Sequence, residues 1–522
     1  MPTATRLLIL VLAFCLFVVT AADAQAPKST RAQTIERVVH LAPFGTNGSR
    51  YVYVPFAVPR RAVRVAVSYA YERAGGENTI DIGVFDARST GSDTDPRGFR
   101  GWSGGRRSEF FISRDEATPG YLPGELPAGT WRVILGLYKV APAGVDVSLK
   151  IEIETEEGRP GGGAPSPRRA ELSSAAPAIA PDDPGGARRL APPAQEVAGQ
   201  NLSWWRGDLH MHTVHSDGDW TVPGLVSAAR DTGLDFISVT DHNTSSHHAE
   251  IGRAGLGSRR PLVLRGEEIT TYGGHTNAWG LPPGAWVDFR VRPGDSARMS
   301  GVAARAHRYG ALISVNHPFA SCGGCAWSYE GALRDFDAVE VWNGEWDETD
   351  ESALKMWDGL LRRGLRLTAV ASSDSHRPQN PIGRPTTYVA AGELSEASLL
   401  AAIRRGRVYL TAGPYRPAVS FEAGARDGKR TPGSIPGDEI RLGAPGTLRF
   451  FVTVRYAPPG ATVSLISDGR VIRNVPGSSD GKQRQIEIEC ERDGYYRLEV
   501  RDRAGAMLAL TNPIYVKVRA KR

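Results

Sequence analysis

The sequence predicts a multidomain protein in which a β/α domain lies between two antiparallel β-sandwiches, and three observations support this fold class. Residues 30–156 alternate between apolar and polar side chains with period two. In residues 204–415, apolar β-branched runs alternate with amphipathic segments. Strand-like alternation returns in residues 416–522. Because a chain of 522 residues exceeds what one hydrophobic core usually serves, about three domains are expected.

The first 24 residues have the features of a secretory signal peptide. Arg6 is followed by an apolar run at residues 7–19 and by Ala22-Asp23-Ala24, which has the small-x-small form of a cleavage site. The run is too short to span a bilayer comfortably, and no later segment reaches the length of a membrane helix. Gln25 rather than Cys follows the expected cut, which argues against a lipid anchor. We therefore expect a periplasmic or secreted protein without a membrane span.

Residues 30–156 are expected to form the N-terminal sandwich, followed by a linker at residues 157–203. The alternation is clearest at residues 145–153, where each strand position in turn faces the core or the solvent. The same pattern occurs at residues 50–58, 63–71, 79–85 and 130–138. Residues 158–200 contain 8 Pro, 7 Gly and 10 Ala but no aromatic side chain. Such a composition cannot bury enough apolar surface to order itself, which is typical of a linker.

Residues 204–415 are expected to form the β/α domain, and residues 416–522 a second, Ig-like sandwich. Strands of the β/α domain are predicted at residues 236–240, 262–264, 312–315, 338–341 and 367–371. Its helices are predicted at residues 223–232, 297–309, 350–363 and 396–405, the last with Ser395 as N-cap. The C-terminal strands are predicted at residues 448–456, 462–466, 485–490, 495–500 and 514–518, with a hairpin turn at Asp468-Gly469.

Composition excludes some classes of protein. The formal charge is +6, but the basic residues are scattered rather than gathered in one run, so no nucleic-acid partner is expected. Of the four cysteines, Cys15 belongs to the signal peptide and Cys490 continues a strand alternation as a buried small side chain. Cys322 and Cys325 are close in sequence and too few for a structural zinc site, which favours a local disulfide.

The histidines are concentrated in the β/α domain. Ten of the eleven fall between His210 and His376, and they recur with carboxylates, usually just after a predicted strand. The groups are His210-Met211-His212 with Asp217, Asp241-His242, Glu268, His275, His317 and Asp374-Ser375-His376. Because the carboxyl ends of parallel strands meet at one mouth, side chains distant in sequence are expected to converge there. Imidazole and carboxylate ligands suit zinc, manganese or iron, so a divalent metal site is predicted.

Six short motifs in the same region resemble those of the polymerase and histidinol phosphatase (PHP) superfamily. They are Gly207-Asp208-Leu209-His210-Met211-His212 with Ser216-Asp217-Gly218, Thr240-Asp241-His242-Asn243, Gly266-Glu267-Glu268-Ile269-Thr270, Gly274-His275-Thr276-Asn277, Asn316-His317-Pro318 and Ser373-Asp374-Ser375-His376. The flanking sandwiches and the export signal look like the carbaryl-hydrolase-like branch. The resemblance implies a distorted (β/α)7 TIM-like barrel with two or three metal ions per chain.

Carried over by position, the resemblance also implies a ligand set. A first metal would be held by His210, His212, Glu268 and Asp374. A second would bind Glu268, His275 and His317, with Glu268 bridging. A third would bind Asp217, His242 and His376. Glu268 is preferred to Glu267 because the family pattern is Gly-x-Glu followed by Ile or Val and Thr.

These ligands predict a hydrolase that needs neither a protein nucleophile nor an organic cofactor. Divalent ions that share a water lower its pKa from about 15.7 toward roughly 7, which makes a hydroxide nucleophile available at neutral pH. The catalytic unit would be this metal-bound water with Glu268, Asp374 and His376. Asp208 and Asp241 are expected either to orient ligand imidazoles or to cap turns.

Other polar and aromatic residues are assigned less specific roles. Arg377 and Arg384 are possible substrate contacts, since a guanidinium can grip a phosphate or carboxylate, and a structural role is the alternative. His215, His247 and His248 are interpreted as neighbours of the ligands or surface residues, and His307 as structural. The remaining candidates for pocket lining, which packing would equally explain, are Trp279, Trp327, Trp342 and Trp346.

The leading hypothesis is hydrolysis of a small-molecule phosphomonoester or phosphodiester. A carbamate, ester or amide hydrolase of the carbaryl-hydrolase type is the closest alternative, because the same nucleophile serves both. Arginines at the mouth would favour phosphate, whereas an apolar, tryptophan-lined mouth would favour an aryl ester or carbamate. A non-catalytic surface-binding protein and a nuclease are further alternatives. The intact ligand set argues against the first, and the lack of a basic tract against the second.

Overall fold

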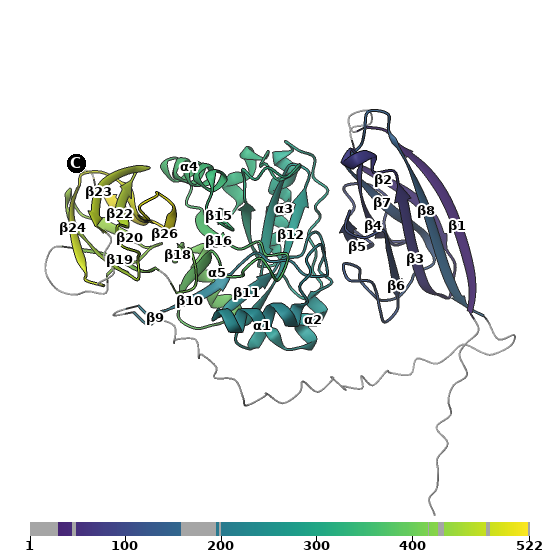
Figure 1. The fold of residues 1–522 in the computed structure, drawn as a ribbon, viewed down its shortest axis with the longest axis horizontal. Coiled ribbons are helices and arrows are strands. Elements are labelled where there is room, and N and C mark those ends of the chain that lie inside the picture. The colour runs from purple at the N-terminus through teal and green to yellow at the C-terminus, as the bar shows by residue number, and fades with distance from the viewer. Residues whose placement is uncertain are drawn as a thin grey trace, which may run out of the picture.

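A computed structural model describes residues 30–43, 49–157, 195–197, 200–415, 417–425, 433–476 and 481–519. The predicted signal peptide and most of the predicted linker lie outside these described residues. The described chain is multidomain, as the sequence predicts, and it is mainly β with few helices. Within this part of the chain, no helix is both long and apolar enough to cross a membrane. Figure 1 shows three parts in a row, with the β/α domain between two β domains.

The N-terminal domain consists of two four-stranded antiparallel sheets, with strand orders β1-β8-β3-β6 and β2-β7-β4-β5. Their apolar faces pack together around Trp131, Val147 and Ile151, which are almost completely buried. A single turn of 3₁₀ helix, η1 (Ala74–Gly76), follows β3. The strands are β1 (Thr30–Leu41), β2 (Tyr51–Val58), β3 (Ala62–Tyr71), β4 (Thr79–Phe85), β5 (Phe99–Gly104), β6 (Glu109–Ser113), β7 (Gly129–Lys139) and β8 (Val145–Glu156).

The central domain has a sheet with the order β16-β15-β14-β13-β12-β11-β10-β17-β18. Its strands are β10 (Ser203–Asp208), β11 (Phe236–Val239), β12 (Leu262–Thr271), β13 (Gly274–Trp279), β14 (Leu312–Asn316), β15 (Ala338–Asn343), β16 (Thr368–Ser372), β17 (Thr386–Ala391) and β18 (Val408–Thr411). The short β9 (Gln195–Glu196) pairs with β10. The helices are α1 (Val222–Thr232), α2 (His248–Arg253), α3 (Ser296–Arg308), α4 (Glu348–Arg362) and α5 (Glu396–Arg404), with 3₁₀ turns η2 (Leu256–Ser258) and η3 (Glu330–Asp335).

Local sequence signals explain where these helices begin. The side chains of Thr221, Asp295 and Ser395 each accept a backbone N–H in the first turn of α1, α3 and α5. At the start of α4, Asp347 and Asp350 form a reciprocal capping box. The four helices that the sequence predicts correspond to α1, α3, α4 and α5, whereas the six-residue α2 is too short to show a period.

The central sheet does not close into the predicted seven-stranded barrel. Only two residues, 272 and 273, separate β12 from β13, so these strands form an antiparallel hairpin instead of a parallel pair with a crossover helix. Strand β16 lies at one end of this sheet, and side chains form hydrogen bonds with the backbone groups of its edge. The hydroxyl of Thr387 donates to Ala371 O (2.6 Å) and accepts from Ala371 N (2.9 Å). The Asn512 side chain binds Ala369 in the same reciprocal way, so no backbone ladder joins β16 to β17.

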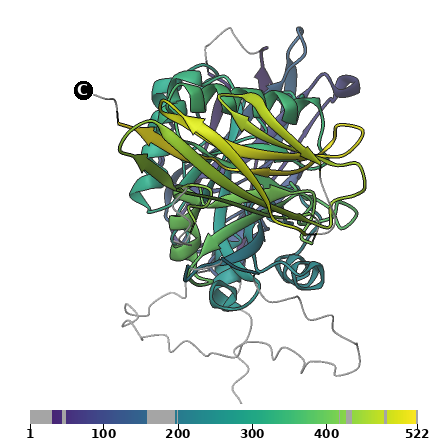
Figure 2. The ribbon, with the colours of Figure 1, turned by 90° about the vertical axis from the view of Figure 1, so that its left-hand side faces the viewer.

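The C-terminal domain is built on the end of the central sheet. Strand β18 pairs with β26, and the sheet continues through β25 and β22 to β23, with β27 and β20 alongside β25. A second sheet, β19-β21-β24, packs on it through a shared hydrophobic core, and Figure 2 views the molecule from the end at which this domain lies. Trp204, Tyr388 and Tyr409 of the central sheet belong to its core. The strands are β19 (Ala418–Ala425), β20 (Glu439–Leu442), β21 (Gly446–Arg455), β22 (Thr462–Ser467), β23 (Arg470–Pro476), β24 (Arg484–Cys490), β25 (Gly494–Arg501), β26 (Met507–Thr511) and β27 (Ile514–Val518).

The N-terminal domain packs on the central domain through a buried aromatic interface. Phe99 stacks on Trp286 with ring centroids 4.0 Å apart, and Trp102 packs on Phe289 at 4.7 Å. Arg290, which is 1% exposed, extends from the central domain and donates to Tyr53 Oη (2.6 Å) and to backbone carbonyls of the sandwich. The two domains therefore share one hydrophobic core, and the sandwich is held in place above the central sheet.

Candidate metal centre

The predicted ligands meet at one edge of the central sheet. His210 and His212 follow β10, His242 follows β11, His317 follows β14, and Asp374 and His376 follow β16. These strands run parallel, so their carboxyl ends lie together. Strand β13 is antiparallel to both neighbours, and so His275 near its beginning reaches the same edge. Glu268 lies on β12, and a backbone bridge pairs it with His242.

The four residues predicted for the first metal face one another. His210 Nε2 lies 3.3 Å from Asp374 Oδ1 and 3.3 Å from Glu268 Oε2. His212 Nε2 lies 3.1 Å from the same Asp374 oxygen and 3.4 Å from the same Glu268 oxygen. Both imidazoles are completely buried. The structure thus brings together two nitrogens and two oxygens from three separate strands.

The other two predicted groups lie on either side of this one. Glu268 Oε1 is 3.2 Å from His275 Nδ1 and 3.3 Å from His317 Nε2. Asp217 Oδ1 is 3.5 Å from His242 Nε2 and 3.4 Å from His376 Nε2. His212 belongs to this last group by distance as well, and His210 to the Glu268 and His317 group. The three groups therefore share members and form one continuous cluster.

Two observations indicate that divalent ions fit this cluster. Four buried atoms that point into it have no hydrogen-bond partner among the described residues, namely His210 Nε2, His212 Nε2, Asp217 Oδ1 and Glu268 Oε2. Native proteins seldom leave such atoms unsatisfied. Two ligand atoms that each lie about 2.1 Å from one ion, at angles of about 90–110°, are about 3.0–3.4 Å apart. The separations across the first group match this spacing.

The electrostatics of the cluster favour cation binding. Burial alone would raise the pKa of Glu268, but the imidazoles of His210, His242 and His275 outweigh burial and hold that pKa well below its usual range. Asp374 behaves in the same way, mainly through His210. Asp217 and Glu268, against the cost of burial, raise the pKa of His242 to about 9. The acids are therefore ionised, and a cation that binds here displaces protons from imidazoles.

The backbone at the cluster is held in unusual conformations. Asn243, His317 and Asp374 have positive φ angles of 54°, 25° and 51°. Such conformations cost free energy in residues other than glycine and persist where surrounding contacts enforce them, commonly at functional sites. Gly218 permits a close approach, because a Cβ there would lie 2.5 Å from the backbone of His212. The Asp217 loop can therefore fold back over the His-x-His segment.

A family model described as PHP-associated matches residues 361–408, which include β16, the segment with Asp374 and His376, and α5. The match therefore covers part of the ligand cluster, and the order of the ligands along the chain resembles that of the PHP motifs. The match agrees with the resemblance of the motifs to the PHP superfamily, so we call the nine predicted ligands the PHP cluster and the central domain that carries them the PHP domain. No curated protein matches the sequence.

Three similar solved structures are distant from this chain in sequence. A two-domain protein from Bacteroides vulgatus, which contains a predicted PHP-like metal-dependent phosphoesterase, is 19% identical over 63% of this chain and 100% of its own, with a TM-score of 0.38. An amidohydrolase from Chromobacterium violaceum is 16% identical over 34% of this chain and 89% of its own, with a TM-score of 0.24. A periplasmic lysozyme inhibitor from Aeromonas hydrophila is 14% identical over 23% and 85%, with a TM-score of 0.14.

Glu340 supports the PHP cluster and was not predicted from the sequence. Its Oε1 lies 3.0 Å from His210 Nδ1, and its Oε2 accepts hydrogen bonds from His317 N (3.0 Å) and the Asn343 side chain (3.0 Å). The carboxylate is 2% exposed, in the middle of the buried strand β15. A single acid inside an apolar strand is the signal that would have identified it, because a buried charge needs partners. Asn316 similarly donates to Glu268 Oε1 at 3.1 Å.

Asp208 and Asp241, which lie beside the predicted ligands in the first two motifs, hold loops in place. Asp208 accepts backbone N–H groups of Ser373 (3.1 Å) and Gly383 (2.7 Å), and so connects the end of β10 to the segment after β16. Asp241 accepts the N–H of Thr213 (2.7 Å) and the hydroxyl of Ser216 (2.7 Å). Neither contacts a predicted ligand imidazole in these bonds. Of the two roles expected for them, loop fixing is the one that the structure shows.

Neighbouring polar residues lie outside the PHP cluster. Glu267 turns away from Glu268 and accepts the N–H of Val287 (2.9 Å), as strand alternation requires. His215 contacts Ser246 and Glu250. His247 and His248 both place Nε2 3.0 Å from Gly266 O, and His307 contacts Asp337 on the surface.

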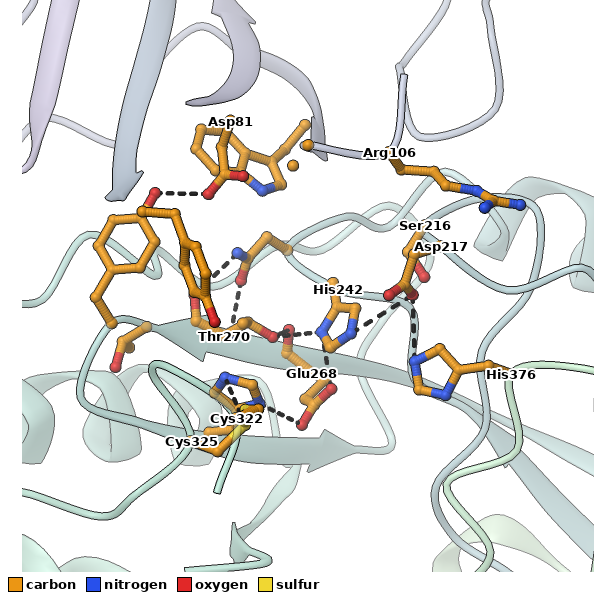
Figure 3. Close-up of a pocket in the computed structure, with 18 of the residues that line it drawn as sticks. Asp81, Arg106, Ser216, Asp217, His242, Glu268, Thr270, Cys322, Cys325 and His376 are labelled. Carbon is orange, nitrogen blue, oxygen red and sulfur yellow. Dashed lines mark hydrogen bonds and ion pairs between the residues drawn. A yellow bond between two sulfur atoms is a disulfide. The ribbon is translucent and has the colours of Figure 1, made fainter. Parts of the chain in front are cut away.

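The PHP cluster opens into a cavity of about 780 Å³ between the central domain and the N-terminal sandwich. Figure 3 shows Asp81 and Arg106 of the sandwich facing His242, Asp217 and His376. Asp81 accepts a hydrogen bond from Tyr272 Oη (2.7 Å) across the domain interface. The sandwich lines the cavity with Tyr51, Thr79, Asp81, Trp102, Ser103, Gly104, Gly105, Arg106 and Tyr138. The sequence contained no signal for this contribution.

The two arginines proposed as substrate contacts lie at different places on the molecule. Arg377 lines the PHP cavity, whereas Arg384 lines a separate depression together with Trp220 and Tyr415. Among the described residues that line the cavity, none is one of the four tryptophans named from the sequence. Trp279, for example, is 1% exposed and donates to Leu209 O (2.8 Å), so it is a packing residue. The tryptophan of the cavity is Trp102 of the sandwich.

Cys322 and Cys325 form a disulfide at the rim of the same cavity. Cys325 Sγ lies 3.9 Å from His275 Nε2, so the bridge packs against a predicted ligand. Cys490 is a free, buried thiol at the end of β24, in agreement with the interpretation as a small core residue.

Proposed function

We propose that this protein is an exported, metal-dependent hydrolase that acts on small phosphomonoesters or phosphodiesters. The observation that carries the proposal is the cluster itself. Eight of the nine predicted ligands form three overlapping groups, and the ninth, His275, lies 3.2 Å from Glu268, at the floor of a substrate-sized cavity. Divalent ions bound there would supply Lewis acidity and lower the pKa of water. The metal identity is proposed as zinc, manganese or iron, because the ligands are imidazoles and carboxylates.

Hydrogen bonds around the cluster orient its imidazoles for cation binding. The carbonyl of Asp374 can only accept, so His376 Nδ1, 2.8 Å away, carries a proton and donates it. His376 Nε2, which lies 3.4 Å from Asp217 Oδ1, is thereby left as the ring atom that a cation can bind after its proton is displaced. Glu340 acts on His210 in the same way, because it accepts from Nδ1 and leaves Nε2 toward Glu268 and Asp374. The two oxygens of Glu268 face different groups, which suits a bridging ligand.

Two features of the cavity bear on the substrate. Arg106 and Arg377 line one side and favour an anionic phosphoester. Tyr51, Trp102 and Tyr272 line the cavity as well and favour an aryl group, which supports hydrolysis of an aryl ester or carbamate as the second candidate function. The assignment to the carbaryl-hydrolase-like branch belongs with that second candidate and stays a prediction.

Export is proposed from the N-terminal segment, and the disulfide beside the cavity supports it, because disulfides persist in oxidising compartments. Sequencing of the mature N-terminus from the native host would test this. We expect a protein that begins at Gln25 in the periplasmic or secreted fraction, and an intact Met1 in the cytosol would contradict export.

The test of the hydrolase uses metal analysis together with an activity screen over aryl phosphates, phosphodiesters, aryl esters and aryl carbamates. His210→Ala should lose bound metal and reduce hydrolysis by more than about 100-fold, because even loss of an outer-shell partner costs about 10- to 100-fold. The matched control is His307→Ala, since His307 pairs with Asp337 on the surface and lies outside the cavity. Unchanged metal content and unchanged activity in His210→Ala would show that the assignment is wrong.

A further inference from the structure

The N-terminal sandwich forms a fixed roof over the cavity. Besides the buried aromatic interface, Gly120 N donates to Ser246 Oγ (3.0 Å) and Thr244 Oγ1 donates to Gly120 O (2.9 Å). Arg107, next to Arg106, donates to Val214 O in the loop that leads to Asp217. Gly120 therefore holds the segment after β6 against the central domain, and Arg107 holds the segment between β5 and β6 there. Side chains from this segment have a defined position relative to the ligand cluster.

At this rim, two arginines from different domains share one carboxylate. Arg106 Nη2 lies 2.6 Å from Asp219 Oδ1, and Arg377 Nε lies 3.6 Å from Asp219 Oδ2. The backbone N–H of Asp219 donates to His376 O at 2.7 Å, which attaches the carboxylate to the segment that carries a predicted ligand. Both arginines line the cavity, and Figure 3 shows Arg106 above Asp217 and on the side of His376.

The charge and exposure of this trio suit an anion. Two guanidinium groups and one carboxylate leave a net charge of +1 beside the cluster. Each guanidinium has five N–H donors, and Asp219 takes only part of them. The side chains of Arg106 and Arg377 are 43% and 61% exposed, so their other donors can reach a bound group. When no anion is bound, Asp219 keeps the two arginine side chains near each other.

A domain latch is the alternative role for Arg106, but the interface does not need one. Exposed ion pairs contribute little to stability because water screens them. The buried guanidinium of Arg290 and the stacked rings of Phe99 and Trp286 already hold the sandwich. A role as a domain latch does not explain why Arg106 lies at the cavity and not elsewhere on the interface.

We propose that Arg106 and Arg377, held by Asp219, form an anion-binding subsite that recognises the negatively charged oxygens of the substrate. The N-terminal sandwich thereby makes the site selective for esters of phosphoric acid over uncharged esters. This inference rests on the proposed hydrolase function and deepens it, because it assigns substrate selectivity to a residue outside the PHP domain.

The test compares two substrates with one leaving group and different charge, p-nitrophenyl phosphate and p-nitrophenyl acetate, on the full-length metal-loaded protein. Arg106→Ala should lower kcat/KM for the phosphate about 10- to 100-fold, mainly through KM, because a charge-assisted pair of hydrogen bonds is lost. The value for the acetate should change by less than about twofold. Arg106→Lys keeps the charge but loses the planar fork, so an intermediate value is expected.

The matched control is Arg114→Ala, which removes another exposed, ion-paired arginine of the same sandwich that does not line the cavity. It should leave both substrates unaffected. An equal loss on both substrates in Arg106→Ala would show a structural role and overturn the subsite. Unchanged kcat/KM for the phosphate would overturn it too.

A binding measurement separates this inference from the hydrolase proposal. If the wild-type protein hydrolyses neither substrate, the hydrolase function fails, and calorimetric titration with inorganic phosphate then tests the subsite alone. A phosphate affinity that falls about 10-fold or more in Arg106→Ala but not in Arg114→Ala supports the subsite. Equal affinities in wild type and Arg106→Ala contradict it.

Discussion

At the scale of single residues, the position of a carboxylate decides its role. Glu267 and Glu268 are neighbours, yet strand alternation sends one toward Val287 N and the other into the ligand cluster. Glu340 lies on another strand and reaches both the side chain of His210 and the backbone of His317. A carboxylate that accepts from the far nitrogen of an imidazole fixes the tautomer and the orientation of the ring. Glu340 is therefore a positioning residue for two predicted ligands.

This role predicts that Glu340→Gln weakens metal retention. The amide keeps the size of the side chain but offers one acceptor oxygen in place of two, so His210 and His317 cannot both keep their bonds. Metal affinity should fall about 10- to 100-fold, as measured by competition with a chromophoric chelator. Glu330→Gln changes an exposed glutamate on η3 and should leave the affinity unchanged. Equal metal affinities of Glu340→Gln and wild type would refute the positioning role.

At the scale of elements, short connections and caps determine how the site is assembled. The two-residue turn between β12 and β13 forces an antiparallel hairpin, and this brings His275 to the ligand edge from the opposite direction. The start of α4 similarly fixes the end of β15. Asp350 accepts the N–H of Asn343 (3.0 Å) and of Asp347 (3.1 Å), so it joins the helix to the end of β15, close to Glu340.

The Asp350 carboxyl predicts a pH-dependent stability. Burial raises its pKa from the ordinary value of 3.8 to about 8. The folded chain therefore keeps a proton that the unfolded chain releases, so this group makes stability fall as pH rises from about 4 to about 8. Asp350→Asn removes this titration but loses one acceptor, which costs about 1 kcal/mol at low pH. The deficit of the variant relative to wild type should shrink or reverse by pH 8.

Denaturant unfolding of the two proteins at pH 5 and pH 8 measures this difference. Glu348→Gln, an exposed acid in the first turn of the same helix, should show the pH profile of the wild type. A stability deficit of Asp350→Asn that is the same at both pH values would mean that Asp350 is ionised in the folded protein.

At the scale of the whole molecule, the cavity at the PHP cluster belongs to two domains. The PHP domain supplies the floor with the predicted ligands, and the N-terminal sandwich supplies Asp81, Trp102 and Arg106 as the roof. The C-terminal domain instead extends the central sheet through β18 and β26, on the side that contains Trp204 and Tyr388. The sandwich is thus part of the site, whereas the C-terminal domain is part of the scaffold.

The docking of the sandwich predicts a strong effect of Arg290→Met. This change leaves Tyr53 Oη, Ser92 O and Asp95 O without the buried donor that they share. Loss of one partner from a buried charged network typically costs about 3–5 kcal/mol. We expect a separate, earlier unfolding transition of the sandwich in calorimetry, together with weaker substrate binding and unchanged metal content. Arg308→Met, on the exposed face of α3, is the control, and an unaltered single transition in Arg290→Met would contradict the expectation.

Local periodicity, caps and short motifs in the chain are enough to predict the domain order, most helices and the residues that converge at the cluster. His210, Glu268, Asp374 and their companions lie at strand ends, and parallel strands bring such ends together by geometry alone. The open path of the central sheet was decided by tertiary contacts of Thr387 and Asn512. The roof with Arg106 was likewise decided by tertiary structure, because its packing on the PHP domain depends on complementary surfaces more than 100 residues apart, which leave no periodic trace in the chain.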